Sequence, residues 1–325
     1  MILAGDIGGT NTRLALFTQQ GGRLEAVVED TFASREHPNL TAIVKKFLSS
    51  RNVSVEIACF GVAGPVQRGR TQATNLPWLV DARRLEQELR IHTVHLLNDL
   101  EAAAHAIALL PAEDLVVLNR GAPDASGNAA VIAAGTGLGE AGLYWDGRQH
   151  HPFACEGGHS SFAPTDHLQL EFLSYLMRDL SHVSWERVVS GPGLLSIYQF
   201  LRETGRGEEP AWLAAAMQGD DPSAVISQAA LAGTNALCEQ ALDLFVSLYG
   251  AEAGNVALKI MATGGVYVAG GIAPKIIKKL MEPHFMKAFV AKGRLQPLVQ
   301  DIPVRVIMND KAALLGAARF AMLQA

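Results

Sequence analysis

Short apolar runs separated by small polar turns dominate the first hundred residues. Within residues 2–17, an apolar run enters a turn of glycine, threonine and asparagine, and a second apolar run leaves it. This pattern predicts a strand, a tight turn and another strand. Further strands are predicted over residues 23–32, 53–62, 69–74 and 93–97, and helices over residues 40–48, 82–89 (with Asp81 as N-cap) and 98–110. Strands paired in hairpins and followed by helices indicate an α/β domain.

The later part of the chain repeats this order, which suggests a distant internal duplication. A buried strand over residues 129–134 is followed by a glycine turn and by a strand that Asp146-Gly147 closes. Helices are then predicted over residues 167–179, 193–203, 211–217, 223–248 and 311–323, with strands over 262–269 and 304–308 and a helix that holds Pro274 in its first turn. Pro111 marks the expected boundary between a small α/β domain, residues 1–110 with the C-terminal helix 310–325 packed back on it, and a large one, residues 111–309.

Composition narrows the class of protein. The 325 residues are 49% hydrophobic and 18% charged, which allows substantial cores and argues against disorder. The net charge is -5 and no basic block occurs, so nucleic acid is not an expected partner. Cys59, Cys155 and Cys238 lie far apart and form no CxxC, which fits a reducing cytosol without a zinc or disulfide framework. Neither a signal peptide nor a membrane span is expected.

Three glycine turns follow buried strands and are candidate phosphate sites. In the first, Gly8-Gly9 are expected to adopt backbone angles that a side chain would forbid, so that amide groups can converge on an anion. Asp6 stands just before this turn, where its carboxylate could hold a cation beside phosphate oxygens. The alternative is an ordinary hairpin with a glycine turn.

The second turn, residues 135–139, is part of a GxGxxG match at residues 137–142. A dinucleotide site needs a helix to begin inside the glycines, but residues 143–147 continue as a hairpin strand, so a phosphate turn is the better interpretation. At the third turn, Gly270-Gly271 end a strand at the start of a helix, where free N–H groups favour anions or the backbone can pass a nucleotide. The alternative there is close helix–strand packing.

Polar side chains beside strands and turns are the candidates for chemistry. Asp99 is expected on the loop after a strand, where it can accept a proton from a substrate hydroxyl, although Asn98 and Glu101 also read as a capping box. Glu156 and His159 flank two glycines and present two hydrogen-bonding groups to one ligand, unless they are structural. Glu186 alone reads as a solvated acid of a helix's first turn.

Together these residues resemble the zinc-free type of bacterial glucokinase, within the sugar kinase–Hsp70–actin superfamily. The matching segments, in the family's order, are residues 5–11, 97–99, 134–139, 156–159, 186–193 and 270–274. The resemblance implies an α/β fold of two actin-like ATPase (ribonuclease H-like) domains around a cleft, with mixed sheets flanked by helices. Residues 74–78 match more loosely, at Asn75 and Trp78, where the family lines its sugar cleft.

The resemblance also implies an activity: ATP-dependent phosphorylation of glucose at its 6-hydroxyl, the first step of glycolysis, in the cytoplasm. Asp99 would be the general base, and Asp6 would hold Mg²⁺ through water, with no structural zinc. The residues implied to bind the sugar are Asn98, Asp99, Glu156, His159 and Glu186. Those implied to bind ATP are Gly5, Asp6, Ile7, Gly8, Gly9, Thr10, Asn11, Gly135, Thr136, Gly137, Gly270 and Gly271. A homodimer is expected from the family, with the apolar helices between residues 190 and 250 as a possible interface.

Two other hypotheses remain at this point. One is a sugar sensor or scaffold that binds ATP and sugar without transfer, which the presence of Asp99 and of three glycine turns disfavours. The other is an Hsp70-like ATPase, which would normally need an appended substrate module.

Overall fold

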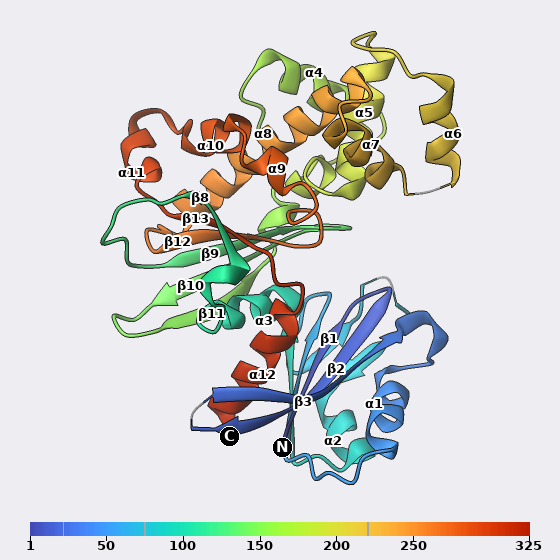
Figure 1. Ribbon diagram of the computed structural model, residues 1–325, viewed down its shortest axis with the longest axis vertical. Coiled ribbons are helices and arrows are strands. Elements are labelled where there is room, and N and C mark those ends of the chain that lie inside the picture. The colour runs from blue at the N-terminus through green and yellow to red at the C-terminus, as the bar shows by residue number, and fades with distance from the viewer. Residues whose placement is uncertain (22, 75, 220) are drawn as a thin grey trace. The chain divides into compact units, whose positions relative to one another are not determined.

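The computed structural model describes residues 1–21, 23–74, 76–219 and 221–325 (Figure 1). Asn75, which was expected to line a sugar site, lies outside the described residues. The chain divides into two compact units. The first comprises Met1–Ala112, His151–Ala154 and Asn309–Ala325, and the second Glu113–His150 and Cys155–Met308. Within the described residues, no helix combines the length and apolar character needed to cross a membrane.

The first unit is built on a mixed five-stranded sheet with the order β3-β2-β1-β4-β7. Its strands are β1 (Ile2–Ile7), β2 (Asn11–Gln20), β3 (Arg23–Ala33), β4 (Ile57–Val62) and β7 (Thr93–Asn98), and a separate hairpin joins β5 (Arg70–Gln72) to β6 (Leu79–Asp81). Strand β1 pairs antiparallel with β2 and parallel with β4, and β4 pairs parallel with β7. The predicted opening hairpin is therefore confirmed.

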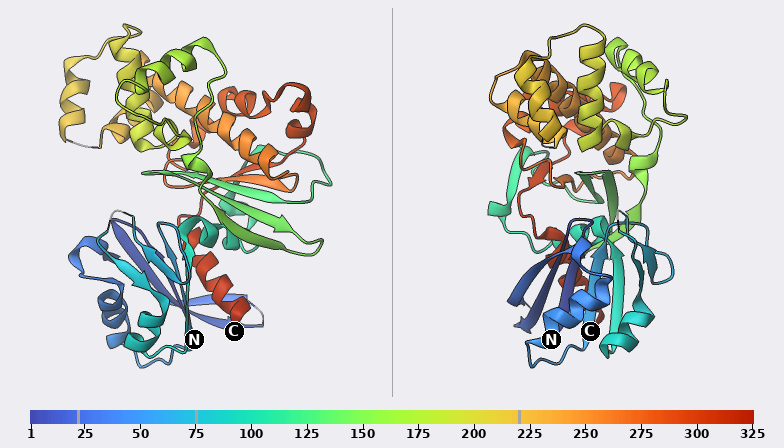
Figure 2. Two further views of the ribbon diagram at one scale, coloured as in Figure 1. Left: turned by 180° about the vertical axis from the view of Figure 1, so that it is seen from behind. Right: turned by 90° about the vertical axis from the view of Figure 1, so that its right-hand side faces the viewer.

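Helices cover both faces of this sheet, because successive side chains of a strand point to opposite faces. They are α1 (Leu40–Ser49), α2 (Ala82–Leu89), α3 (Asp99–Ala106) and α12 (Ala312–Gln324), with a 3₁₀ turn η1 (Ser34–Glu36). Leu3 of β1 shares a core with Phe47 of α1, whereas Ala4 shares one with Leu314 of α12. Figure 2 shows α12, in red, on the sheet face opposite α1 and α2. A Cβ added at Gly316 would lie 1.7 Å from Ala102 O, so only glycine lets α12 approach α3 this closely.

The second unit has a six-stranded sheet with the order β11-β10-β9-β12-β13-β8. Its strands are β8 (Leu115–Asn119), β9 (Ala129–Ala134), β10 (Leu138–Trp145), β12 (Gly265–Ala269) and β13 (Val304–Ile307), with β11 (His150–Cys155) at the edge, of which His151–Ala154 are counted with the first unit. Strand β9 pairs antiparallel with β10 and parallel with β12, and β12 pairs parallel with β13. Five of these strands thus repeat the order of the first sheet, and β9, β10, β12 and β13 also repeat its directions, as the predicted duplication requires.

Helices of the second unit pack on one face of its sheet around a single large core (Figure 1). They are α4 (His167–Leu176), α5 (Gly191–Glu203), α6 (Ala211–Gly219), α7 (Pro222–Leu231), α8 (Ala236–Lys259), α9 (Ile277–Leu280), α10 (Pro283–Val290) and α11 (Gln296–Gln300). Short 3₁₀ turns are η2 (Ala112–Asp114), η3 (Gly157–His159), η4 (Trp185–Arg187) and η5 (Gly293–Leu295). Helix α8 runs through the core and buries most of its residues.

Several predicted boundaries are wrong. The helix expected over residues 223–248 is two helices, because Gly233 turns left-handed (φ 64°) after α7 and Asn235 caps α8. The strand expected from residue 53 starts at Ile57, the partner of Ile2. The helix expected to reach residue 110 ends at Ala106, ahead of Pro111. Pro274 lies in a run of turns before α9 rather than in a helix.

Candidate functional site

The first glycine turn joins β1 to β2 and is closed by backbone hydrogen bonds. Gly8 N donates to Asn11 O at 2.9 Å. Ser34, at the end of the neighbouring strand β3, holds the turn from outside: its N donates to Thr10 O at 2.8 Å and its Oγ to Gly8 O at 2.8 Å. The turn is therefore fixed by the sheet before any ligand arrives.

The reason for its glycines differs from the expected one. Neither Gly8 nor Gly9 has a positive φ, so the expectation of backbone angles closed to other residues is wrong. At Gly5 and Gly8 the constraint is space instead. A Cβ added at Gly5 would lie 2.5 Å from the ring of Phe60, and one at Gly8 would lie 3.0 Å from Asn11 O.

Asp6 is the charged group beside this turn. It pairs in register with Arg13 of β2, and Arg13 in turn forms an ion pair with Asp310 at 2.7 Å. Burial raises the pKa of the Asp6 carboxyl to about 6, against the lowering effect of Arg13, while Asp310 adds to the rise. An ionised carboxylate in such surroundings gains from a nearby cation.

Asn98 and Asp99 mark the junction between β7 and α3. Asn98 is the N-cap: its Oδ1 accepts from Leu100 N at 2.9 Å and from Glu101 N at 3.4 Å, and its Nδ2 donates to Gly64 O at 3.2 Å. Asp99 was expected on a loop, but it is the first residue of α3, because this cap starts the helix directly at the strand end. Its Oδ1 accepts from Leu100 N at 2.9 Å. The capping interpretation of Asn98 is thus confirmed, and the cap also fixes the position of Asp99.

The second glycine turn, between β9 and β10, contacts Glu186. Gly135 N donates to Gly137 O at 2.8 Å, and Gly191 N donates to Gly135 O at 2.8 Å. Leu138 N donates to Glu186 Oε2 at 3.0 Å. A Cβ added at Gly137 would lie 2.4 Å from the same carboxylate oxygen. Strand β10 continues from Leu138 without a helix, which confirms the rejection of a dinucleotide site.

Glu186 and the second turn also border one cavity of about 270 Å³. The cavity therefore brings together a residue predicted to bind sugar and a turn predicted to bind phosphate. Its lining residues are Thr136, Tyr175, Leu176, Asp179, Leu180, Glu186, Arg187, Ser190, Pro192, Ser196 and Gln199.

Glu156 and His159 lie at either end of the 3₁₀ turn η3. Both side chains are exposed, and His159 Nε2 lies 4.0 Å from Glu156 Oε2. The two glycines between them pack against β10: a Cβ added at Gly158 would lie 2.1 Å from Leu138 O. The turn thus presents two polar side chains outward while its backbone rests on the sheet.

The third glycine turn is closely packed at Gly270 and exposed at Gly271. Gly270 has φ 86° and a Cβ there would lie 2.4 Å from Ala134 O, so this residue serves close packing beside the second turn. Ile272 N donates to the same carbonyl at 3.3 Å. Gly271, by contrast, is exposed, and a Cβ there would meet nothing within 4 Å.

Glu140 is a polar residue beside the site that the sequence interpretation missed. It is buried (3% exposed) on β10 below the turn η3. The available signal was a glutamate inside an otherwise apolar strand.

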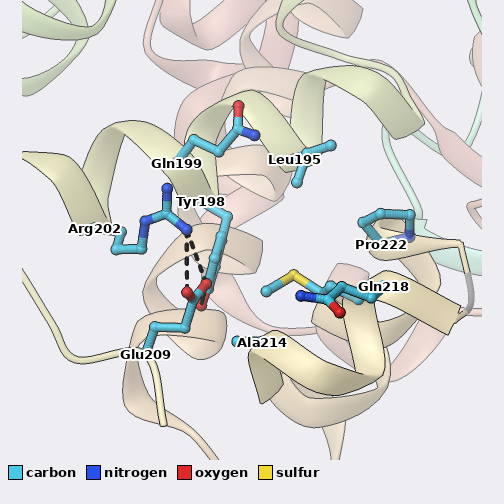
Figure 3. A pocket seen from close by; sticks show the side chains of 9 residues that line it. Leu195, Tyr198, Gln199, Arg202, Glu209, Ala214, Gln218 and Pro222 are labelled. Carbon is cyan, nitrogen blue, oxygen red and sulfur yellow. Dashed lines mark hydrogen bonds and ion pairs between the residues drawn. The ribbon is translucent and has the colours of Figure 1, made fainter. Parts of the chain in front are cut away.

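An acidic cluster and a cavity of the second unit each contain charged side chains that pair with one another. Asp243, Glu282 and His284 present ligand atoms within 4.8 Å of one another, but Lys279 Nζ lies 2.7 Å from Asp243 and 2.8 Å from Glu282 and supplies the positive charge. A cavity of about 280 Å³ lies between α5, α6 and α7 (Figure 3). There Glu209 accepts from Tyr198 Oη at 2.9 Å and from Arg202 Nη1 at 3.0 Å.

Comparisons with known proteins match the whole chain. A protein-family model described as glucokinase covers residues 3–324. The chain is 43% identical over 334 residues to a glucokinase of Nostoc sp., with 98% of both chains covered. Among solved structures, it is similar to a glucokinase from an Antarctic psychrotroph (TM-score 0.86, 31% identity, 99% of this chain and 98% of that one). A ROK family glucokinase from Streptomyces griseus in complex with glucose and AMPPNP has the same fold (TM-score 0.66, 21% identity, 99% of both chains).

Proposed function

Because the chain belongs to the glucokinase family, we propose that it transfers the terminal phosphoryl group of ATP to the 6-hydroxyl of D-glucose. The products are glucose 6-phosphate and ADP, as in the first step of glycolysis. The observation that carries this proposal is the match to glucokinases along nearly the full chain at 43% identity. The residue roles below are proposals that the local geometry supports.

Asp99 is the general base on the 6-hydroxyl. The N-terminus of α3 favours its ionised form, since the helix dipole is positive at that end. A carboxylate there can accept the hydroxyl proton as the oxygen attacks phosphorus. Because phosphoryl transfer depends mainly on positioning and charge stabilisation, this base contributes about 10²–10⁴-fold to the rate.

Glu156, His159 and Glu186 hold other hydroxyls of the sugar, and Asn98 orients a neighbouring one. Each sugar hydroxyl can donate one hydrogen bond and accept others, so carboxylates and an imidazole suit it. Glu186 already accepts from Leu138 N through Oε2, which fixes the side chain and assigns the sugar contact to Oε1. Such a site rejects a sugar that lacks one hydroxyl by about 10⁴-fold, because a polar group is left unpaired.

ATP binds at the glycine turns, and Asp6 holds Mg²⁺ through water. The Mg²⁺ ion neutralises phosphate charge when bound. The supporting observation is that burial raises the pKa of the Asp6 carboxyl to about 6, so a cation stabilises its ionised form. The exposure of Gly271 supports the proposal that the third turn contacts ATP.

Three further statements stay predictions. Residues 1–110 with 310–325, and residues 111–309, form the two domains. The protein is a homodimer that uses helices between residues 190 and 250. Its compartment is the cytoplasm, and it carries no structural zinc.

Replacing Asp99 by Asn tests the base. We expect kcat to fall by about 10²–10⁴-fold, while the Kd for glucose changes by less than about tenfold, because the amide cannot take the proton but keeps the shape. Asp124→Asn, at an exposed position, is the matched control and leaves both values unchanged. A D99N enzyme with the wild-type kcat would remove Asp99 from this role.

A steady-state assay of ADP release with a panel of hexoses tests the function itself. The kinase releases ADP only when glucose is present. A sugar sensor would bind glucose without releasing ADP, and an Hsp70-like ATPase would release ADP without sugar. Either of those two results contradicts the proposal.

A further inference from the structure

A buried carboxyl lies directly beneath the turn that carries Glu156 and His159. Glu140 points from β10 to the sheet face that Ile132, its partner in β9, also occupies, and Ile132 belongs to the apolar core. Only 3% of Glu140 is exposed. A charged residue type in such a place needs a partner or has to be neutral.

The partner is a second buried carboxyl on α8. Glu252 is fully buried and shares a side-chain hydrogen bond with Glu140. It also accepts from Lys259 Nζ at 3.0 Å and from Asn255 Nδ2 at 2.8 Å. Lys292 Nζ extends the network by donating to Asn255 Oδ1 at 2.7 Å. Glu252 thus accepts hydrogen bonds from Lys259 and Asn255, and a protonated Glu140 donates a further one to it.

The other side of the Glu140 carboxyl faces the turn η3. A Cβ added at Gly157 would lie 1.8 Å from Glu140 Oε2 and 2.8 Å from its Cδ, so the carboxyl occupies the space that any other residue's side chain would need. Oε1 of Glu140 is buried and has no hydrogen-bond partner among the described residues. An ionised carboxyl would leave this oxygen charged and unsolvated, whereas a neutral one tolerates it better.

The surroundings favour the neutral form. Burial raises the pKa of Glu140 to about 8, with a further rise from Glu252 and an opposing effect from Lys259. Two buried carboxyls in contact keep one proton between them, since both cannot be charged. The titratable groups around the pair are Glu252, Lys259 and Tyr249 from α8, Cys155 and Glu156 before the turn, His159 at its end and Lys292 beyond α10.

We propose that Glu140, as a neutral carboxyl hydrogen-bonded to Glu252, is a positioning residue that seats the Gly157–His159 turn and thereby places Glu156 and His159 for the sugar. The inference rests on the proposed sugar-binding role of this turn. Loss of the proton puts a second negative charge beside Glu252 and next to the backbone of Gly157. The turn then shifts from β10, and glucose binding weakens.

This gives a pH dependence with a defined sign. The binding-competent fraction is close to one at neutral pH and falls as pH rises through about 8. Because an apparent Kd is the intrinsic Kd divided by that fraction, the Kd for glucose rises about tenfold by about pH 9. The kcat at saturating glucose changes far less, since bound sugar holds the turn in place.

The test measures the Kd of glucose by calorimetry, without nucleotide, between about pH 6.5 and 9.5. Glu140→Gln keeps the shape and the donor to Glu252 but cannot ionise, so it retains the neutral-pH Kd within about twofold and removes the rise above pH 8. Glu140→Ala lacks the donor and leaves a cavity, so it raises the Kd at every pH. Glu113→Gln, exposed in the same unit, behaves as the wild type.

The outcomes distinguish a failure of the proposed Glu140 role from a failure of the proposed function. If E140Q follows the wild-type curve above pH 8, or raises the Kd at neutral pH as much as E140A does, Glu140 is not the positioning group while glucose binding stands. If the wild type does not bind glucose at all, the proposed function fails, and this inference fails with it. Urea unfolding at each pH confirms that every variant is folded under the conditions in which its Kd is measured.

Discussion

At the scale of single residues, Asp6, which is half-buried, and Glu140, which is buried, are carboxyls close to proposed ligand sites. Their surroundings differ. Asp6 has Arg13 across the hairpin, whereas Glu140 has another carboxyl beside it. Asp6 is therefore ionised at neutral pH, at a cost in stability that a bound cation would reduce, while Glu140 stays protonated.

Because the charge on Asp6 lowers the stability of the folded protein, the Asp6→Asn variant should be more stable than the wild type by an amount that depends on pH. Burial raises the pKa of Asp6 from 3.8 to about 6, so the folded state binds more protons than the unfolded state between these values. The stability of the wild type therefore falls as pH rises through this window. A shift of about two units corresponds to about 3 kcal/mol, so D6N should be more stable than the wild type by up to that amount at pH 7, with the difference much smaller near pH 4.

Urea unfolding at both pH values measures this difference, with Asp124→Asn as the exposed control. Asp6→Asn should also lose most of its Mg-ATP-dependent activity, because the amide lacks the negative charge that is proposed to hold Mg²⁺ through water. A D6N protein that is less stable than the wild type at pH 7 would contradict the assignment of a costly buried charge.

Single residues differ in how well the sequence predicts them. The caps Asp81 and Asn98 follow from side-chain chemistry within three or four residues, so they were predictable. The role of Gly5 was not, because the ring of Phe60 that excludes a side chain there comes from a strand fifty residues away. Glu140 was missed for the same reason, since its partner Glu252 lies on α8.

At the scale of elements, the strand-to-helix junction at Asn98 combines stability with catalysis. Asn98→Ala removes the cap of α3 and should cost about 1 kcal/mol of folding free energy. It also frees the first turn of α3, which carries Asp99, so kcat should fall by about tenfold or more.

Asn39→Ala is the matched control for that variant. Asn39 Oδ1 accepts from Ala42 N at 2.9 Å and caps α1 in the same unit. Its loss should therefore cost a similar free energy while kcat stays at the wild-type value. Denaturant unfolding and steady-state kinetics of both variants check this, and equal kcat values would show that the Asn98 cap has no catalytic consequence.

Elements with a strong local pattern were predictable and those set by tertiary partners were not. The strand at Ala129–Ala134 and the helix at Ala82–Leu89 fall where the sequence places them. The break between α7 and α8 was missed, although Gly233 and Asn235 are stop and start signals, because the apolar spacing runs through it. Strand β11 was missed because its edge sequence HHPFAC has a weak apolar pattern, whereas β8 was missed although residues 115–118 are all apolar.

At the scale of the whole molecule, the chain uses one actin-like strand order twice. Each copy places a glycine turn between its first two strands, β1–β2 and β9–β10. The local repeat was visible in the sequence. The pairing of β9 with β12, more than 120 residues apart, was not, because periodicity specifies a face and not its partner.

The proposed reaction is phosphoryl transfer from ATP to one hydroxyl of glucose. Phosphorus NMR of a reaction containing the purified protein, Mg-ATP and glucose tests it most directly, because the spectrum identifies the phosphorylated position and counts the products together. We expect glucose 6-phosphate and ADP in equal amounts, with no inorganic phosphate above the enzyme-free control. Inorganic phosphate in place of a sugar phosphate, or a phosphate on another hydroxyl, would contradict it.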